Sequence, residues 1–108
     1  MVELLGAADI RELATRLDVT PTKKLGQNFV TDPNTIRRIV ASAKLVGSET
    51  VVEIGPGLGS LTLGLLEVAD SVVSVEIDTK MAAALEATIA TRAPGTDFAL
   101  VKADAMQI

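Results

Sequence analysis

The segment VVEIGPGLGSLT, residues 51–62, passes from β-branched residues through three alternate glycines into helix-forming sequence. Glycine tolerates positive φ and lets bare main chain approach a ligand. A glycine-rich loop between a strand and a helix is typical of nucleotide-binding α/β domains. The dinucleotide pattern G-x-G-x-x-G is not met, because Ser60 stands where its last glycine is required. The segment therefore predicts a ligand-binding loop of the form G-x-G-x-G at the carboxyl end of a parallel sheet.

Short apolar segments alternate with helical ones from residue 50 onward. We predict three strands and two helices, in the order Thr50–Ile54, helix Ser60–Val68, Ser71–Ile77, helix Thr79–Thr91 and Phe98–Val101. This order predicts right-handed crossovers and a parallel sheet, and the continuous apolar strands indicate helices on both of its faces. Complete doubly wound domains have five or more strands, so we expect about half of such a domain.

Two short helices are expected before the sheet. Asp9 and Glu12 have the spacing of a capping box, which predicts a helix to about Leu17. Asp32-Pro33 predicts an N-cap followed by proline at the first helical position, in a helix that runs to about Lys44. The apolar face expected for this second helix consists of Ile36, Ile39, Val40 and Ala43.

The composition excludes several classes of function. The chain has 108 residues, of which 48% are hydrophobic and 22% charged, as in one small globular domain. It contains no Cys and no His, so we expect no metal site, no thiol nucleophile and no hydrolytic triad. No segment approaches the roughly eighteen apolar residues of a membrane span, and no signal-peptide pattern is present, which predicts a cytoplasmic protein with no membrane partner.

Acidic residues stand at the ends of all three predicted strands. Glu53 precedes Gly55 by two positions and would repel a pyrophosphate but favour an ammonium or sulfonium group, unless it only bonds a nearby backbone N–H or Lys. Glu76 stands where a carboxylate accepts hydrogen bonds from ribose hydroxyls, and Asp104 could accept from the amine of an adenine. Asp78 is better explained as the N-cap of the next helix. Together these residues predict S-adenosylmethionine as the cofactor.

With these motifs the sequence resembles the ribosomal RNA adenine dimethyltransferases, from about Leu17 to Ile108. KLGQNFV, residues 24–30, looks like the family's GQNFL signature, with Val30 in place of the more usual Leu. VVEIGPGLGSLT, VVSVEID and KADAM look like the next three family motifs, in order. The resemblance implies the N-terminal half of a Rossmann-like class I methyltransferase sheet. It also implies an enzyme that dimethylates N6 of two adjacent adenosines near the 3′ end of small-subunit ribosomal RNA, acting on that RNA or on a pre-30S particle.

The resemblance also implies roles for individual residues. Asn28 and the main chain of Val30 should contact the methionine part of S-adenosylmethionine, Gly55 its amino-acid end, Glu76 the ribose and Asp104 the adenine. Residues 1–47 would be a helical extension that includes a cofactor-covering GQNF loop, and residues 48–108 the first half of the cofactor-binding domain. We expect the family's N-[LI]-P-[YF] motif, which holds the target adenine, to lie beyond Ile108. No catalytic residue is therefore named, and we expect no methyl transfer by this chain alone.

Basic residues are concentrated before the glycine loop. Residues 1–47 carry seven Lys or Arg against five Asp or Glu, whereas residues 48–108 carry three against nine. This basic set, which could face RNA phosphates or form an ordinary solvated surface, consists of Lys23, Lys24, Arg37 and Arg38.

Three alternative functions stay open at this point. The first is an NAD-type dinucleotide-binding module, which Ser60 and Glu53 disfavour. The second is a non-enzymatic nucleic-acid-binding relative of the family, and the third is a chain that binds nothing because half of its sheet is missing. We also expect self-association, since Val51–Ile54 would be an unpaired apolar edge.

Overall fold

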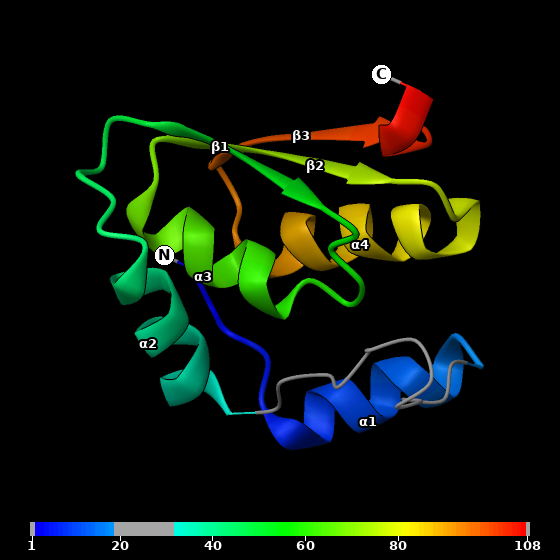
Figure 1. The fold of residues 1–108 in the computed structure, drawn as a ribbon. Coiled ribbons are helices and arrows are strands. Elements are labelled where there is room, and N and C mark those ends of the chain that lie inside the picture. The colour runs from blue at the N-terminus through cyan, green and yellow to red at the C-terminus, as the bar shows by residue number, and fades with distance from the viewer. Residues whose placement is uncertain (1, 19–31, 108) are drawn as a thin grey trace.

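A three-stranded parallel sheet in the order β1-β2-β3 is the centre of the structure (Figure 1). The structure is a computed structural model, which describes residues 2–18 and 32–107. Along the chain the elements are α1 (Ala7–Arg16), α2 (Pro33–Ser42), β1 (Thr50–Ile54), α3 (Ser60–Val68), β2 (Ser71–Glu76), α4 (Thr79–Arg92), β3 (Asp97–Lys102) and the short 3₁₀ helix η2 (Ala105–Gln107). The predicted α/β class, the order of strands and helices along the chain and the two N-terminal helices are confirmed.

Both crossover helices lie on the same face of the sheet. Figure 1 shows α3 and α4 beneath the strands, and in the described part of the chain no helix lies on the opposite face. The expectation of helices on both faces was therefore wrong. The face on which a right-handed crossover places its helix depends on the side of the first strand on which the second strand lies. In the order β1-β2-β3 each new strand lies on the same side of the one before, so both helices lie on the same face. The uncovered face exposes Val52 and Ile54 of β1 and Val101 of β3.

Capping residues set the start of each N-terminal helix. The predicted N-cap Asp9 was wrong: α1 begins at Ala7 with Gly6 as its N-cap, because Ala7 and Ala8 are strong helix formers that extend the helix ahead of Asp9. Asp9 instead lies in the first turn, where its Oδ2 accepts a hydrogen bond from the backbone N–H of Gly6 at 2.9 Å. The prediction for α2 is confirmed, since Asp32 Oδ1 accepts from the backbone N–H of Asn34 at 2.9 Å and Pro33 follows it.

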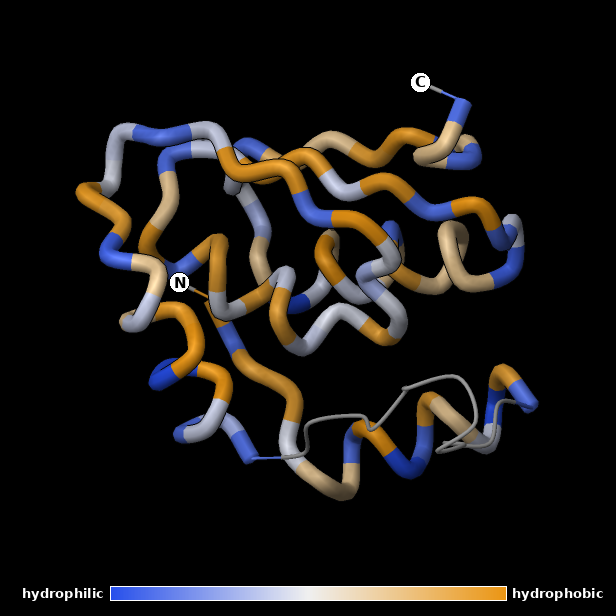
Figure 2. The backbone as a smooth tube through the Cα atoms, in the orientation of Figure 1, coloured by the Kyte–Doolittle hydropathy of each residue, from blue (hydrophilic) through white to orange (hydrophobic). Residues whose placement is uncertain are grey.

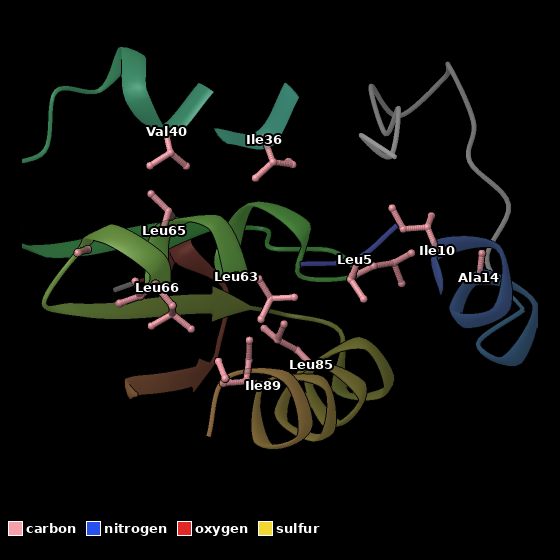
Figure 3. Packing of buried hydrophobic residues seen from close by; sticks show 14 of the residues in the cluster. Leu5, Ile10, Ala14, Ile36, Val40, Leu63, Leu65, Leu66, Leu85 and Ile89 are labelled. Carbon is pink, nitrogen blue, oxygen red and sulfur yellow. The ribbon is translucent and has the colours of Figure 1, made fainter. Parts of the chain in front are cut away.

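One apolar cluster joins the N-terminal helices to the covered face of the sheet. Figure 3 shows Leu63 of α3 facing Leu85 of α4, while Ile36 and Val40 of α2 approach α3 from the other side. A Cβ on Gly64 would collide with the Ile36 side chain, so this glycine permits the close contact between α2 and α3. Ile39, which was expected on the same face of α2, is 42% exposed.

Hydrophobic residues are concentrated along the strands and in α3, as Figure 2 shows. None of the described helices is both long enough and apolar enough to cross a bilayer.

Candidate cofactor site

The carboxyl ends of the three strands lie side by side. The backbone N–H of Gly55, which follows β1, donates to the carbonyl of Val75 in β2 at 2.9 Å. The N–H of Ala103, which follows β3, donates to the carbonyl of Glu76 at 3.1 Å. These two bonds continue the hydrogen bonding between strands by one residue past the ends of β1 and β3. The loops that follow all three strands therefore lie at one edge of the sheet. Gly55 and Glu76 therefore lie on neighbouring strand ends, and Asp104 directly follows the third.

The glycine loop between β1 and α3 depends on backbone conformations that other residues rarely adopt. Gly55, Gly57 and Gly59 have φ angles of 68°, 60° and 101°. A Cβ on Gly59 would lie 2.7 Å from Leu85 Cδ1, so this glycine also permits α3 to begin against α4. An ideal Cβ on Gly55, by contrast, would have no heavy atom of the described residues within 4 Å. The main chain of Gly55 thus borders open space, as a surface for close contact with a ligand requires.

The two acidic residues at the end of β2 have different local partners. Glu76 is buried, and its Oε2 accepts a hydrogen bond from the backbone N–H of Asp78 at 3.1 Å. Asp78 is the N-cap of α4, as predicted, because its Oδ1 accepts from the N–H groups of Lys80 and Met81 at 2.9 and 3.0 Å. The Asp78 carboxylate therefore caps the helix. Of these two residues, Glu76 is the one predicted to bind the ribose of the cofactor.

Asp104 begins the turn that follows β3. Its Oδ1 accepts a hydrogen bond from the backbone N–H of Met106 at 2.9 Å, and its carbonyl accepts from Gln107 at 3.0 Å. These bonds stabilise η2, and the half-buried Asp104 directly follows Ala103, which is hydrogen-bonded to the end of β2. Both lone pairs of the remaining carboxylate oxygen are free of this turn, which leaves an acceptor for a ligand amine.

The carboxylate of Glu53 is buried beneath the sheet, with 8% of the residue exposed. Its Oε1 accepts hydrogen bonds from Thr62 Oγ1 at 2.5 Å and from Ser74 Oγ at 2.9 Å. Burial raises the pKa of Glu53, and the two hydroxyl donors partly oppose that rise. Sequence reasoning did not find these partners, although a serine between the valines of β2 is the signal that could have indicated one of them.

A comparison with models of protein families shows which family this chain resembles. The family model described as "Ribosomal RNA adenine dimethylase" matches residues 20–108. The chain belongs to the ribosomal RNA adenine dimethylase family. The predicted family resemblance is thereby confirmed.

Curated relatives in this family are much longer than the chain. It is 60% identical to "Ribosomal RNA small subunit methyltransferase A" of Corynebacterium efficiens over 98% of its own length and 37% of that protein. It is 61% identical to the protein of the same name from Kineococcus radiotolerans, over 97% of the chain and 35% of the relative. The chain thus spans little more than a third of the relatives it matches.

Solved structures of related enzymes share the fold. The 23S rRNA methyltransferase ErmE superposes with a TM-score of 0.65 at 36% identity, over 75% of this chain and 32% of that one. A dimethyladenosine transferase from Plasmodium falciparum superposes with a TM-score of 0.63 at 28% identity, over 71% of this chain and 28% of that one. The Rossmann-like methyltransferase fold expected for this family member is therefore confirmed.

Several residues of the predicted site lie outside the described part of the chain. These are Asn28 and Val30 of the GQNF loop and the basic residues Lys23 and Lys24. Their contacts stay predictions.

The two described arginines of the basic set have different partners. Arg37 of α2 donates from Nε and Nη2 to the two carboxylate oxygens of Glu67 in α3, at 3.2 and 3.1 Å, and this hydrogen bond raises the pKa of Arg37. Arg38 donates to Thr35 Oγ1 at 3.2 Å. An RNA phosphate would compete with a carboxylate at Arg37 but only with a hydroxyl at Arg38, so Arg38 is the better candidate for phosphate contact.

The surface pockets formed by the described residues do not coincide with the predicted cofactor site. A groove of about 510 Å³ lies between α1 and α4 and is lined by residues that include Leu13, Ala84 and Ala87. Gly55, Glu76 and Asp104 are not among its lining residues, so this groove is no part of the cofactor prediction. Within residues 2–18 and 32–107, no cluster of three or more Asp, Glu, His or Cys side chains could hold a metal ion.

Proposed function

We propose that this chain is the S-adenosylmethionine-binding part of an enzyme that dimethylates N6 of two adjacent adenosines near the 3′ end of small-subunit ribosomal RNA. Membership of the family and the shared name of the relatives support this reaction. Because the chain spans 37% of the Corynebacterium efficiens relative, the activity and the RNA or pre-30S substrate are proposed for the whole protein. We place that protein in the cytoplasm, and the proposal includes no membrane or metal partner.

One observation carries the cofactor proposal: the strand ends that bear Gly55, Glu76 and Asp104 are joined by backbone hydrogen bonds at one edge of the sheet. The open space over Gly55 fits a ligand held against the main chain. In the proposed arrangement Gly55 holds the amino-acid end of S-adenosylmethionine, Glu76 accepts from the ribose hydroxyls and Asp104 accepts from the adenine amine. Asn28 and Val30 would hold the methionine part.

The chain's own contribution to the reaction would be binding and alignment. The bound cofactor supplies a methyl group on a sulfonium centre, and its transfer to an adenine nitrogen requires correct placement more than a strong base. In this proposal residues 48–108 orient the nucleoside part, while residues 1–47 form the helical extension whose loop covers it. Methyl transfer by this chain alone is not expected, since no residue of it is proposed to hold the target adenine.

Calorimetric titration tests the cofactor proposal directly. We expect the chain to bind S-adenosylmethionine and S-adenosylhomocysteine but not NAD⁺. Glu76→Ala and Asp104→Ala should each raise the Kd by roughly 10- to 100-fold, as expected for a lost hydrogen bond to a charged group. Asp97→Ala is the matched control, because Asp97 is an exposed acid at the opposite end of β3 and should leave the Kd unchanged.

Two outcomes would contradict the proposal. One is binding of NAD⁺ in preference to S-adenosylmethionine. The other is unchanged binding in both site variants, provided that thermal unfolding shows them to be folded.

A further inference from the structure

Glu53, which the sequence placed near the positive charge of the cofactor, is buried, and the contacts proposed for Gly55, Glu76 and Asp104 do not include it. Its Oε1 atom accepts from the hydroxyls of Thr62 and Ser74, both of which are completely buried. Burying a carboxylate is costly even when it is hydrogen-bonded, and an apolar residue of similar volume often serves stability as well. The fold alone therefore gives little reason for a carboxylate at this position.

The three residues come from the three elements that border the glycine loop. Glu53 lies in β1, two residues before Gly55, and Thr62 lies in the first turn of α3, three residues after Gly59. Ser74 is the residue paired with Glu53 in the neighbouring strand β2. One carboxylate oxygen thus connects the strand that enters the loop, the helix that leaves it and the strand beside it.

We propose that Glu53 is a positioning residue that fixes the two ends of the glycine loop and thereby sets its affinity for the cofactor without touching it. This inference rests on the proposed function, because it assumes that the loop binds S-adenosylmethionine. All three loop glycines have positive φ, and glycine restricts the backbone less than any other residue does. The loop therefore depends on its ends to hold one conformation. When only a fraction of the molecules has the binding-competent conformation, the apparent Kd rises in inverse proportion to that fraction.

The decisive variants remove or keep the hydrogen bonds while changing little volume. Thr62→Val removes the donor, and we expect it to weaken binding of S-adenosylmethionine about 10-fold by calorimetry. Thr62→Ser restores the hydroxyl and should bind within about threefold of the unmodified chain. Glu53→Gln keeps an oxygen that can accept from both hydroxyls and should also bind within about threefold. Thr88→Val is the matched control, because Thr88 is a buried threonine of α4 that is not a hydrogen-bond partner of Glu53.

A purely structural role predicts a different pattern. In that case Thr62→Val would lower the melting temperature but leave the Kd of the folded protein unchanged, which would overturn the proposal. Loss of binding in Glu53→Gln together with normal binding in Thr62→Val would also overturn it, because charge rather than positioning would then matter. Ser74→Ala provides a second test of the same hydrogen-bond cluster if Thr62→Val does not fold.

Failure of the proposed function would be recognised separately. In that case the unmodified chain itself would not bind S-adenosylmethionine. If the unmodified chain binds and Thr62→Val binds equally well, only the role of Glu53 is refuted.

Discussion

At the scale of single residues, the burial of Glu53 makes the stability of the fold depend on pH. Its pKa in the folded state is raised by burial above the ordinary value of 4.5. The Glu53 carboxyl group consequently binds its proton more tightly in the folded protein than in the unfolded chain. The stabilising contribution is complete below about pH 4.5 and is lost as the pH rises through the higher folded pKa.

Glu53→Gln should remove this dependence on pH. We expect the melting temperature of the unmodified chain to fall relative to that of the variant as the pH rises above about 4.5. Each 1 kcal/mol corresponds to about 4–8 °C in a domain of this size. Thermal unfolding of both proteins across this range, followed by circular dichroism, measures the difference. Parallel curves for the two proteins would show that the carboxyl group titrates alike in the folded and unfolded states.

At the scale of elements, the contact between α3 and α4 depends on a residue without a side chain. Gly59 is the N-cap of α3 and combines a φ of 101° with the close approach of Leu85. Gly59→Ala should therefore incur both backbone strain of about 1–2 kcal/mol and overpacking of about 1–3 kcal/mol. Chemical denaturation should show a loss of about 2–5 kcal/mol in the free energy of unfolding.

Gly95→Ala is the control that separates these two effects. Gly95 also has a positive φ, 77°, but within the described part of the chain no heavy atom lies within 4 Å of a Cβ placed there. Its replacement should cost only the strain of about 1–2 kcal/mol. Equal losses in the two variants would contradict a packing role for Gly59.

At the scale of the whole molecule, β1 is an edge strand with an uncovered apolar face. Val52 and Ile54 of β1 are 62% and 67% exposed, and one side of the strand has no partner among the described residues. Exposed apolar edges favour pairing with another chain. We expect this chain to self-associate as its concentration rises in sedimentation experiments.

Charged substitutions locate the interface. Val52→Lys and Ile54→Lys should reduce association, because a charge on an edge strand opposes pairing. Val46→Lys is the control, since Val46 is 80% exposed but precedes the sheet. A compact monomer at high concentration of the unmodified chain would contradict this prediction.

The sequence by itself determined the features that depend on neighbouring residues. Apart from the start of α1, which lies three residues before its predicted position, the strands and helices begin and end within a residue or two of their predicted bounds. This agreement arises because apolar periodicity, glycines and caps such as Asp32 and Asp78 act over one helical turn. The gathering of Gly55, Glu76 and Asp104 at one edge also followed from the sequence, since parallel strands end on the same side of a sheet. Their contacts with a cofactor stay predictions.

Only the tertiary structure decided which residues meet across the fold. Thr62 and Ser74 reach Glu53 from positions 9 and 21 residues away, and Arg37 meets Glu67 across a separation of 30 residues. Such contacts depend on the strand register and on how the helices pack, which no local pattern encodes. The placement of α3 and α4 on one face likewise followed from the strand order β1-β2-β3 in the sheet. The apolar strands alone do not decide this, because they could be covered on either face.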